Sequence, residues 1–180
     1  GYNPTNSPTA EQAQKAHQPQ IDLFANSGVD MISALTMTNI PEAIGVVRAA
    51  EVHELASIIS FTLETDGRLP TGELLKDAIE RTDRETNIPP LYYMINCAHP
   101  EHFMDVFSDN EAWIERVGGI RANASRMSHE ELDNAETLDD GNPGEFGELH
   151  GKLADVLPLL RVVGGCCGTD HRHIECVSHQ

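Results

Sequence analysis

The stretch Leu159-Leu160-Arg161-Val162-Val163-Gly164-Gly165-Cys166-Cys167-Gly168-Thr169 places an apolar run, two glycines and two adjacent cysteines in direct succession. Its first part, residues 159–163, has the length and composition of a buried strand. Thr169 and Asp170 supply an N-cap and a first-turn acid for a helix, and the glycines free the backbone before it. The stretch therefore predicts a strand, a tight loop that carries two thiols, and a short last helix.

The rest of the chain repeats this pattern, with short apolar runs separated by segments of helical spacing. Strands that alternate with helices predict βαβ units, and hence an α/β fold whose parallel sheet is covered by helices. The acidic stretch 128–151 is predicted to be a solvated loop. The predicted strands are 29–35, 57–63, 91–96, 118–122 and 159–163, and the predicted helices are 9–26, 41–53, 72–86, 99–117 and 147–157, with the last one after Thr169.

Length and charge limit the classes of protein to which the chain can belong. Its 180 residues fit one domain, and 12 basic against 29 acidic residues give a net charge of −17. Such a charge repels both a nucleic-acid backbone and an anionic membrane surface. No apolar run approaches the roughly 20 residues that cross a bilayer, the polar first residues are no signal peptide, and no glycine-rich phosphate-binding loop is present. We expect an acidic cytoplasmic protein that binds neither nucleic acid nor membrane.

Three of the four cysteines follow predicted strands. Cys97 comes directly after 91–96, and Cys166 and Cys167 come after 159–163 and two glycines. Because the carboxyl ends of parallel strands meet at one edge of a sheet, we expect these three thiols to lie together there. Three thiolates suit Zn²⁺, at about 2.3 Å per bond, and leave a fourth position that a soft ligand such as a substrate thiol can occupy.

Two other interpretations of these thiols stay open. They can simply pack against the sheet, or Cys166 and Cys167 can act as a redox dithiol, although the two residues of such pairs are normally separated by two others. The last helix carries two histidines that are two residues apart, and side chains at that spacing face different directions instead of converging on a metal. The remaining candidates are predicted to be structural: the thiol Cys176 and the histidines His99, His102, His171 and His173.

The motif Gly164-Gly165-Cys166-Cys167-Gly168-Thr169, with Ile95-Asn96-Cys97 upstream, resembles the zinc signature of the homocysteine S-methyltransferase family. Ser60-Phe61-Thr62, Asp66-Gly67 and Gly119-Ile120-Arg121-Ala122-Asn123-Ala124 are similar to the middle and late strands of that family. The resemblance covers essentially the whole chain.

The resemblance implies a (β/α)₈ barrel of the TIM type and a zinc-dependent S-methyltransferase. In such an enzyme a methyl group moves from an onium donor, S-methylmethionine or S-adenosylmethionine, to the thiol of homocysteine, giving methionine. The resemblance carries Cys97, Cys166 and Cys167 over as the zinc ligands and Asn96 as a residue near the substrate. Homocysteine and the methyl donor are the small-molecule partners that it implies.

The chain departs from the family pattern in its length. Five predicted strands cannot close an eight-stranded barrel. Residues 1–180 are therefore expected to form a single homocysteine-methyltransferase-like domain of about five C-terminal βα units that lacks the first three. Gly1-Tyr2-Asn3-Pro4 resembles the end of the loop after the third strand of the family. The open edges of such a sheet favour self-association.

A second departure concerns substrate binding. The family commonly has a glutamate at the end of the fourth strand that holds the substrate amino group, whereas residues 34–38 here are Ala-Leu-Thr-Met-Thr. Thr36 can hydrogen-bond an ammonium group but cannot neutralise it. Glu64, at the end of the strand 57–63, is a candidate to help orient a substrate, and a solvated loop carboxylate is the other interpretation of it. Two alternatives follow: methyl transfer to a different thiol, or a non-enzymatic zinc-binding protein derived from this fold.

Overall fold

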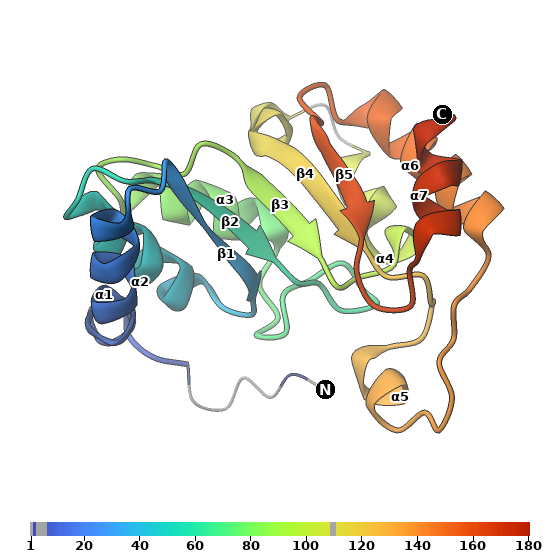
Figure 1. The fold of residues 1–180 in the computed structure, drawn as a ribbon, viewed down its shortest axis with the longest axis horizontal. Coiled ribbons are helices and arrows are strands. Elements are labelled where there is room, and N and C mark those ends of the chain that lie inside the picture. The colour runs from blue at the N-terminus through green and yellow to red at the C-terminus, as the bar shows by residue number, and fades with distance from the viewer. Residues whose placement is uncertain (1, 3–6, 109–110) are drawn as a thin grey trace.

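The computed structural model describes residue 2 and residues 7–108 and 111–180, and in these ranges it contains one five-stranded sheet (Figure 1). Each strand pairs in parallel with the next one along the chain, so the order of the strands in the sheet is their order in the sequence. This order is that of a (β/α)-barrel wall, and it confirms the predicted parallel α/β fold. The strands are β1 (Met31–Met37), β2 (Ala56–Phe61), β3 (Tyr93–Asn96), β4 (Val117–Ala122) and β5 (Val162–Gly165).

Helices precede β1, occupy every connection between strands and follow β5 (Figure 1). The α1–α2 pair packs beside β1, and the α6–α7 pair packs at the other end of the sheet, beside β5. No helix in the described part of the chain is both long and apolar enough to span a bilayer. The helices are α1 (Ala10–Ser27), α2 (Ile40–Glu51), α3 (Leu75–Arg84), α4 (Pro100–Phe103), α5 (His129–Asp133), α6 (Pro143–Val156) and α7 (His171–Ser178), with two short 3₁₀ helices at Met104–Phe107 and Ala112–Arg116.

The five predicted strands are present with shifted ends, and the shift at β5 bears on the cysteine motif. The sequence predicted β5 at 159–163, whereas it spans Val162–Gly165. The N–H of Leu160 donates to the carbonyl of Leu157 at 3.1 Å, and this turn delays the start of strand pairing. The two glycines of the motif therefore end the strand, and Cys166 follows it directly.

The prediction of one helix over 99–117 is wrong. The segment forms α4 and two short 3₁₀ helices, and residues 109–110 lie outside the described part of the chain. The break comes at Phe103, whose backbone angles (φ −132°, ψ −1°) leave the helical region. The interrupted path lets Phe107 contact both Phe103 and Trp113, with ring centroids 6.3 and 5.7 Å apart. Burial of these rings outweighs the weak preference of the segment for a continuous helix.

The prediction that the acidic stretch 128–151 is a solvated loop is also wrong over much of its length. The stretch contains α5 and the first part of α6, which begins at Pro143. Ser128 caps α5 in a capping box with Glu131, and the Asn142 side chain caps α6 by accepting a backbone N–H at 3.2 Å. These local caps start α5, and they start α6 four residues before the predicted helix 147–157.

The close contact between α1 and α2 depends on Gly45. A Cβ atom at this position would lie 2.5 Å from Ala13 Cβ, 2.6 Å from Gln14 N and 2.7 Å from Ala10 O. Two of these three atoms belong to the backbone of α1, which cannot rotate out of the way as a side chain can. A side chain at residue 45 therefore fits only if α1 moves.

We expect Gly45→Ala to lower the free energy of unfolding by about 1–3 kcal/mol, because over-packing outweighs the gain of about 1 kcal/mol in helix propensity. Gly144→Ala on α6 is the matched control, since the nearest atom to its new Cβ, Asn142 Oδ1, is 3.4 Å away. Urea denaturation of both variants measures the difference. A Gly45→Ala midpoint at or above that of the unchanged protein would contradict this account of the contact.

Candidate metal centre

Three thiols lie together at the carboxyl end of the sheet. Cys97 follows β3, and Cys166 and Cys167 follow β5, so their loops meet across the end of β4. The Sγ atoms of Cys97 and Cys166 are 2.7 Å apart, and the Sγ atoms of all three residues lie within 4.8 Å of one another. All three are free thiols. In the described ranges, this is a group of side chains close enough together to hold one metal ion.

Cys97 reaches this group through an unusual backbone conformation. Its φ is +55°, in the left-handed region that residues other than glycine rarely adopt. Its N–H donates to the carbonyl of Arg121 on β4 at 3.1 Å, which continues the sheet pairing by one residue. Such a conformation costs on the order of 1–3 kcal/mol, and it persists at sites where the surrounding contacts hold it in place.

Two glycines of the Gly-Gly-Cys-Cys-Gly motif make room for a tight loop. A Cβ atom on Gly165 would lie 2.0 Å from the Oγ1 of Thr169, whose hydroxyl donates to the carbonyl of Cys166 at 2.8 Å. Gly168 has a φ of +79°, and a Cβ atom there would lie 2.7 Å from the carbonyl oxygen of Asp139. The loop therefore requires glycine on both sides of the cysteine pair.

Asn123 joins the two cysteine loops, and the sequence analysis gave it no role. Its side-chain Oδ1 accepts a hydrogen bond from the Cys167 N–H at 3.1 Å, and its own N–H donates to the carbonyl of Ala98 at 3.0 Å. The residue is 3% exposed. The signal that points to it is its place directly after β4, the strand between the two that carry the thiols.

The thiols have different pKa values because of their contacts. The hydrogen bond from Cys97 lowers the pKa of Cys166 to about 7, and the same interaction together with burial raises the pKa of Cys97. Burial raises the pKa of Cys167. Cys166 is therefore the thiol of this group that loses its proton most readily. A cation held by the three cysteines would displace the protons that remain.

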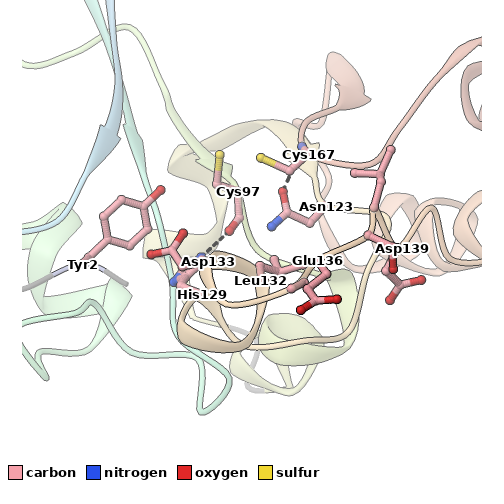
Figure 2. Close-up of a pocket in the computed structure, with 12 residues that line it drawn as sticks. Tyr2, Cys97, Asn123, His129, Leu132, Asp133, Glu136, Asp139 and Cys167 are labelled. Carbon is pink, nitrogen blue, oxygen red and sulfur yellow. Dashed lines mark hydrogen bonds between the residues drawn. The ribbon is translucent and has the colours of Figure 1, made fainter.

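A cavity of about 450 Å³ opens beside the cysteines (Figure 2). Cys97, Cys167 and Asn123 line one side of it, and residues of the loop 132–139 line another. Tyr2, the one described residue of the predicted loop end 1–4, also faces the cavity. Burial and the neighbouring thiols raise the pKa of Tyr2 to about 12, so its hydroxyl stays neutral at physiological pH. The cavity gives a small molecule access to the thiols.

Asn96 and Thr36, both predicted to bind substrate, are hydrogen-bonded to each other. The Asn96 Oδ1 accepts from the Thr36 N–H at 2.9 Å and from the Ser60 hydroxyl at 2.5 Å, and its Nδ2 donates to the Thr36 Oγ1 at 2.7 Å. Thr36 has a φ of +62°. The third candidate, Glu64, has its Oε1 3.1 Å from the Nδ1 of His129. Contact of these residues with a substrate stays a prediction.

The other cysteine and four histidines of the sequence analysis are not in the metal-competent group of the described residues. His173 is fully buried on α7 and contacts the carbonyl of Asp140 at 2.8 Å. Cys176 packs its backbone against Gly147 of α6. His99 caps α4, with its Nδ1 accepting the Glu101 N–H at 3.3 Å.

We expect His99 to make the fold sensitive to acid. Burial lowers the pKa of His99 to about 4, so between pH 6.5 and 4 the unfolded chain binds a proton that the folded chain does not. Its contribution to stability is thus full above pH 6.5 and is lost as the pH falls. His99→Asn keeps a capping side chain without the titration. From pH 7.5 to 5, its free energy of unfolding should fall by about 1 kcal/mol less than that of the unchanged protein, after allowance for solvent screening. Urea denaturation at the two pH values measures both proteins. If their free energies of unfolding fall by the same amount between pH 7.5 and 5, His99 is not the source of the sensitivity.

Comparison with known proteins agrees with the geometry. The family model of homocysteine S-methyltransferase matches residues 1–180. Structures of the homocysteine methyltransferase MmuM from Escherichia coli have a similar fold: the metallated form is 16% identical with a TM-score of 0.69, and the oxidised form is 17% identical with a TM-score of 0.70. These matches cover 99% of this chain and 54% and 55% of the two MmuM chains. The chain thus spans just over half the length of these structures.

Identities of 16% and 17% establish the shared fold alone. No curated protein sequence matches the chain. The match to the family model, by contrast, extends over the full sequence, including both cysteine loops. The chain belongs to the homocysteine S-methyltransferase family.

Proposed function

We propose that the chain is part of a zinc-dependent S-methyltransferase that moves a methyl group from an onium donor to the thiol of homocysteine, giving methionine. The observation that carries this proposal is the convergence of three thiols from two loops beside a cavity of about 450 Å³. Family membership supports the reaction class. S-methylmethionine or S-adenosylmethionine is the proposed donor.

The three cysteines suit a zinc ion. Tetrahedral Zn–S bonds of about 2.3 Å separate the sulfur ligands by roughly 3.8 Å. That value lies between the 2.7 Å of the Cys97–Cys166 pair and the 4.8 Å within which all three sulfur atoms lie. Sulfur ligands also favour zinc over magnesium or calcium. Bound zinc supplies Lewis acidity, which keeps a coordinated substrate thiol deprotonated at neutral pH.

The residues of the chain would hold and orient the reactants. Cys97, Cys166 and Cys167 would fix the thiol position, and Asn123 would keep the two cysteine loops in register. Asn96 and Thr36 would shape the neighbouring floor of the site, and Glu64 would face the amino group of the substrate. Alignment of thiol and methyl carbon contributes several kcal/mol to such a reaction. The transfer would balance as follows. The acceptor thiol would lose its proton on metal binding, and its sulfur would form a bond to the methyl carbon. The bond from that carbon to the donor sulfur would break, and the donor would leave as a neutral sulfide.

One observation favours an alternative to homocysteine as the thiol that accepts the methyl group. Thr36, at the end of β1, carries no charge, and its hydroxyl accepts a hydrogen bond from Asn96 at 2.7 Å. This side chain therefore offers no carboxylate to an ammonium group. A thiol without an amino group is the second candidate acceptor, and a zinc-binding protein without activity is the third.

X-ray absorption at the zinc edge, with and without homocysteine, tests the proposal. We expect three sulfur ligands in the free protein and a fourth after homocysteine is added. Cysteamine, which keeps the amino group, and 3-mercaptopropionate, which lacks it, separate the two acceptor classes. A zinc site whose sulfur count does not change with any thiol would favour the non-enzymatic alternative.

The remaining proposals concern the setting of the protein. A reducing compartment such as the cytoplasm would keep the thiols free for zinc. We also propose that residues 1–180 form a single domain equivalent to the five C-terminal units of the family barrel, since the chain covers 54–57% of the MmuM structures. The apolar side chains exposed on β1 and β5 would then favour self-association in the absence of three further units: Met31, Leu35, Val162 and Val163.

A further inference from the structure

The ring of His129 lies between Cys97 and Glu64. Its Nε2 is 2.6 Å from the carbonyl oxygen of Cys97, and its Nδ1 is 3.1 Å from the Oε1 of Glu64. The His129 side chain is 12% exposed. Because a carbonyl oxygen can only accept, the Nε2–H of His129 is the donor in the first contact.

This contact acts on the strained residue of the metal centre. Cys97 has a φ of +55°, and its carbonyl oxygen has two hydrogen-bond donors near it in the described structure. His129 is at 2.6 Å, whereas the hydroxyl of Thr62 is at 3.5 Å, the outer limit for a hydrogen bond. His129 is therefore the principal contact that holds the peptide after Cys97 in its orientation.

The start of α5, the ring of Tyr2 and the approach of Glu64 define the surroundings of the His129 ring. His129 is the first residue of α5, which begins with the Ser128–Glu131 capping box. The ring of Tyr2 meets it edge-on, with centroids 4.6 Å apart and an interplanar angle of 77°. Glu64, from the loop after β2, faces its second nitrogen. The loops after three consecutive strands thus meet at this ring, which Figure 2 shows beside Cys97.

We propose that His129 is a positioning residue for the metal centre. It donates to the carbonyl of Cys97 and stabilises the left-handed backbone that aims the thiol at Cys166 and Cys167. The inference rests on the proposed zinc site. Residues that support a metal ligand in this way change metal affinity by about 10–100-fold when they are removed.

The test is zinc affinity, measured by competition with a chromophoric chelator. We expect His129→Ala to weaken zinc binding by about 10–100-fold, and His129→Gln, whose amide can still donate to the Cys97 carbonyl, to stay within about threefold of the unchanged protein. His102→Ala is the matched control, because the Nε2 of His102 also contacts a backbone carbonyl, that of Arg126 at 2.9 Å. Its affinity should not change.

A spectroscopic readout separates positioning from general stability. With saturating Co²⁺ in place of zinc, the thiolate-to-cobalt absorption of His129→Ala should fall by roughly a third, because one of three thiolates is no longer aimed at the metal. His129→Phe, which keeps a ring beside Tyr2 but has no N–H to donate, should weaken zinc binding by about 10–100-fold, and it tests the contact even if His129→Ala does not fold.

Three outcomes overturn the inference: zinc affinities of His129→Ala and His129→Phe that both equal that of the unchanged protein, equal losses of affinity in His129→Ala and His129→Gln, or an unaltered cobalt spectrum in folded His129→Ala. An unchanged protein that binds no zinc overturns the proposed metal site itself, which distinguishes that failure from the failure of the inference.

Discussion

Alanine at Cys97, Cys166 or Cys167 should abolish stoichiometric zinc binding, whereas alanine at Cys176 should leave it intact. Each of the first three variants removes one of three sulfur ligands, and the affinity should fall by more than about 100-fold, the upper end for residues that only support a ligand. Cys176 lies on α7, in contact with Gly147, and is not in the sulfur group of the described residues.

Elemental analysis of the purified variants, followed by chelator competition, measures this result. Cys176→Ala controls for the loss of a thiol as such, because it removes the same chemical group at a distance from the site. Full zinc content in Cys166→Ala would remove the basis of the proposed centre. Zinc loss in Cys176→Ala at unchanged thermal stability would show that the ligand set is different.

The second large effect concerns methyl transfer. A protein extended at its N-terminus by three βα units of the family should form methionine from homocysteine and S-methylmethionine at least about 100-fold faster than residues 1–180 alone. The physical reason is alignment: the thiols would supply a reactive sulfur, but the rate also depends on holding the sulfur and the methyl carbon in line. Misplacement by about 1 Å is enough for a loss of this size.

Assays of both lengths at equal zinc content check this expectation. Cys166→Ala in the extended protein gives the rate without the metal centre. Equal turnover by the two lengths would mean that five strands suffice. Inactivity of both, with zinc bound, would favour a different thiol acceptor or a protein without activity.

Much of the fold follows from local pattern. The apolar runs predicted all five strands because each is rich in Val, Ile, Leu or aromatic residues and is followed by turn residues. In the middle of the sheet, burial matches this pattern: five of the six residues of Ala56–Phe61 are buried. The prediction of one helix over 99–117 was wrong because three aromatic rings pack together only when the helix is broken at Phe103. That contact depends on the tertiary fold, and helical spacing alone carries no trace of it.

The candidate site was predictable only in part, for a related reason. Cys97, Cys166 and Cys167 follow strands directly, so a parallel sheet predicts their meeting. Asn123 and His129 lie in a loop after β4 and reach the cysteine loops through one or two hydrogen bonds each. The path of that loop, including α5, is set by contacts with residues distant in sequence, and such contacts leave no periodic signal.

The meeting of Cys97 and Cys166 has a consequence for the unfolded chain. The two residues are 69 positions apart in the sequence, and a cation shared by their sulfur atoms would close a ring of that size. For a permanent link, a ring of this length removes about 4 kcal/mol of chain entropy from the unfolded state. A metal ion held there would act as a removable cross-link between the middle and the C-terminal end of the chain, so the stability of the fold would depend on the supply of the ion.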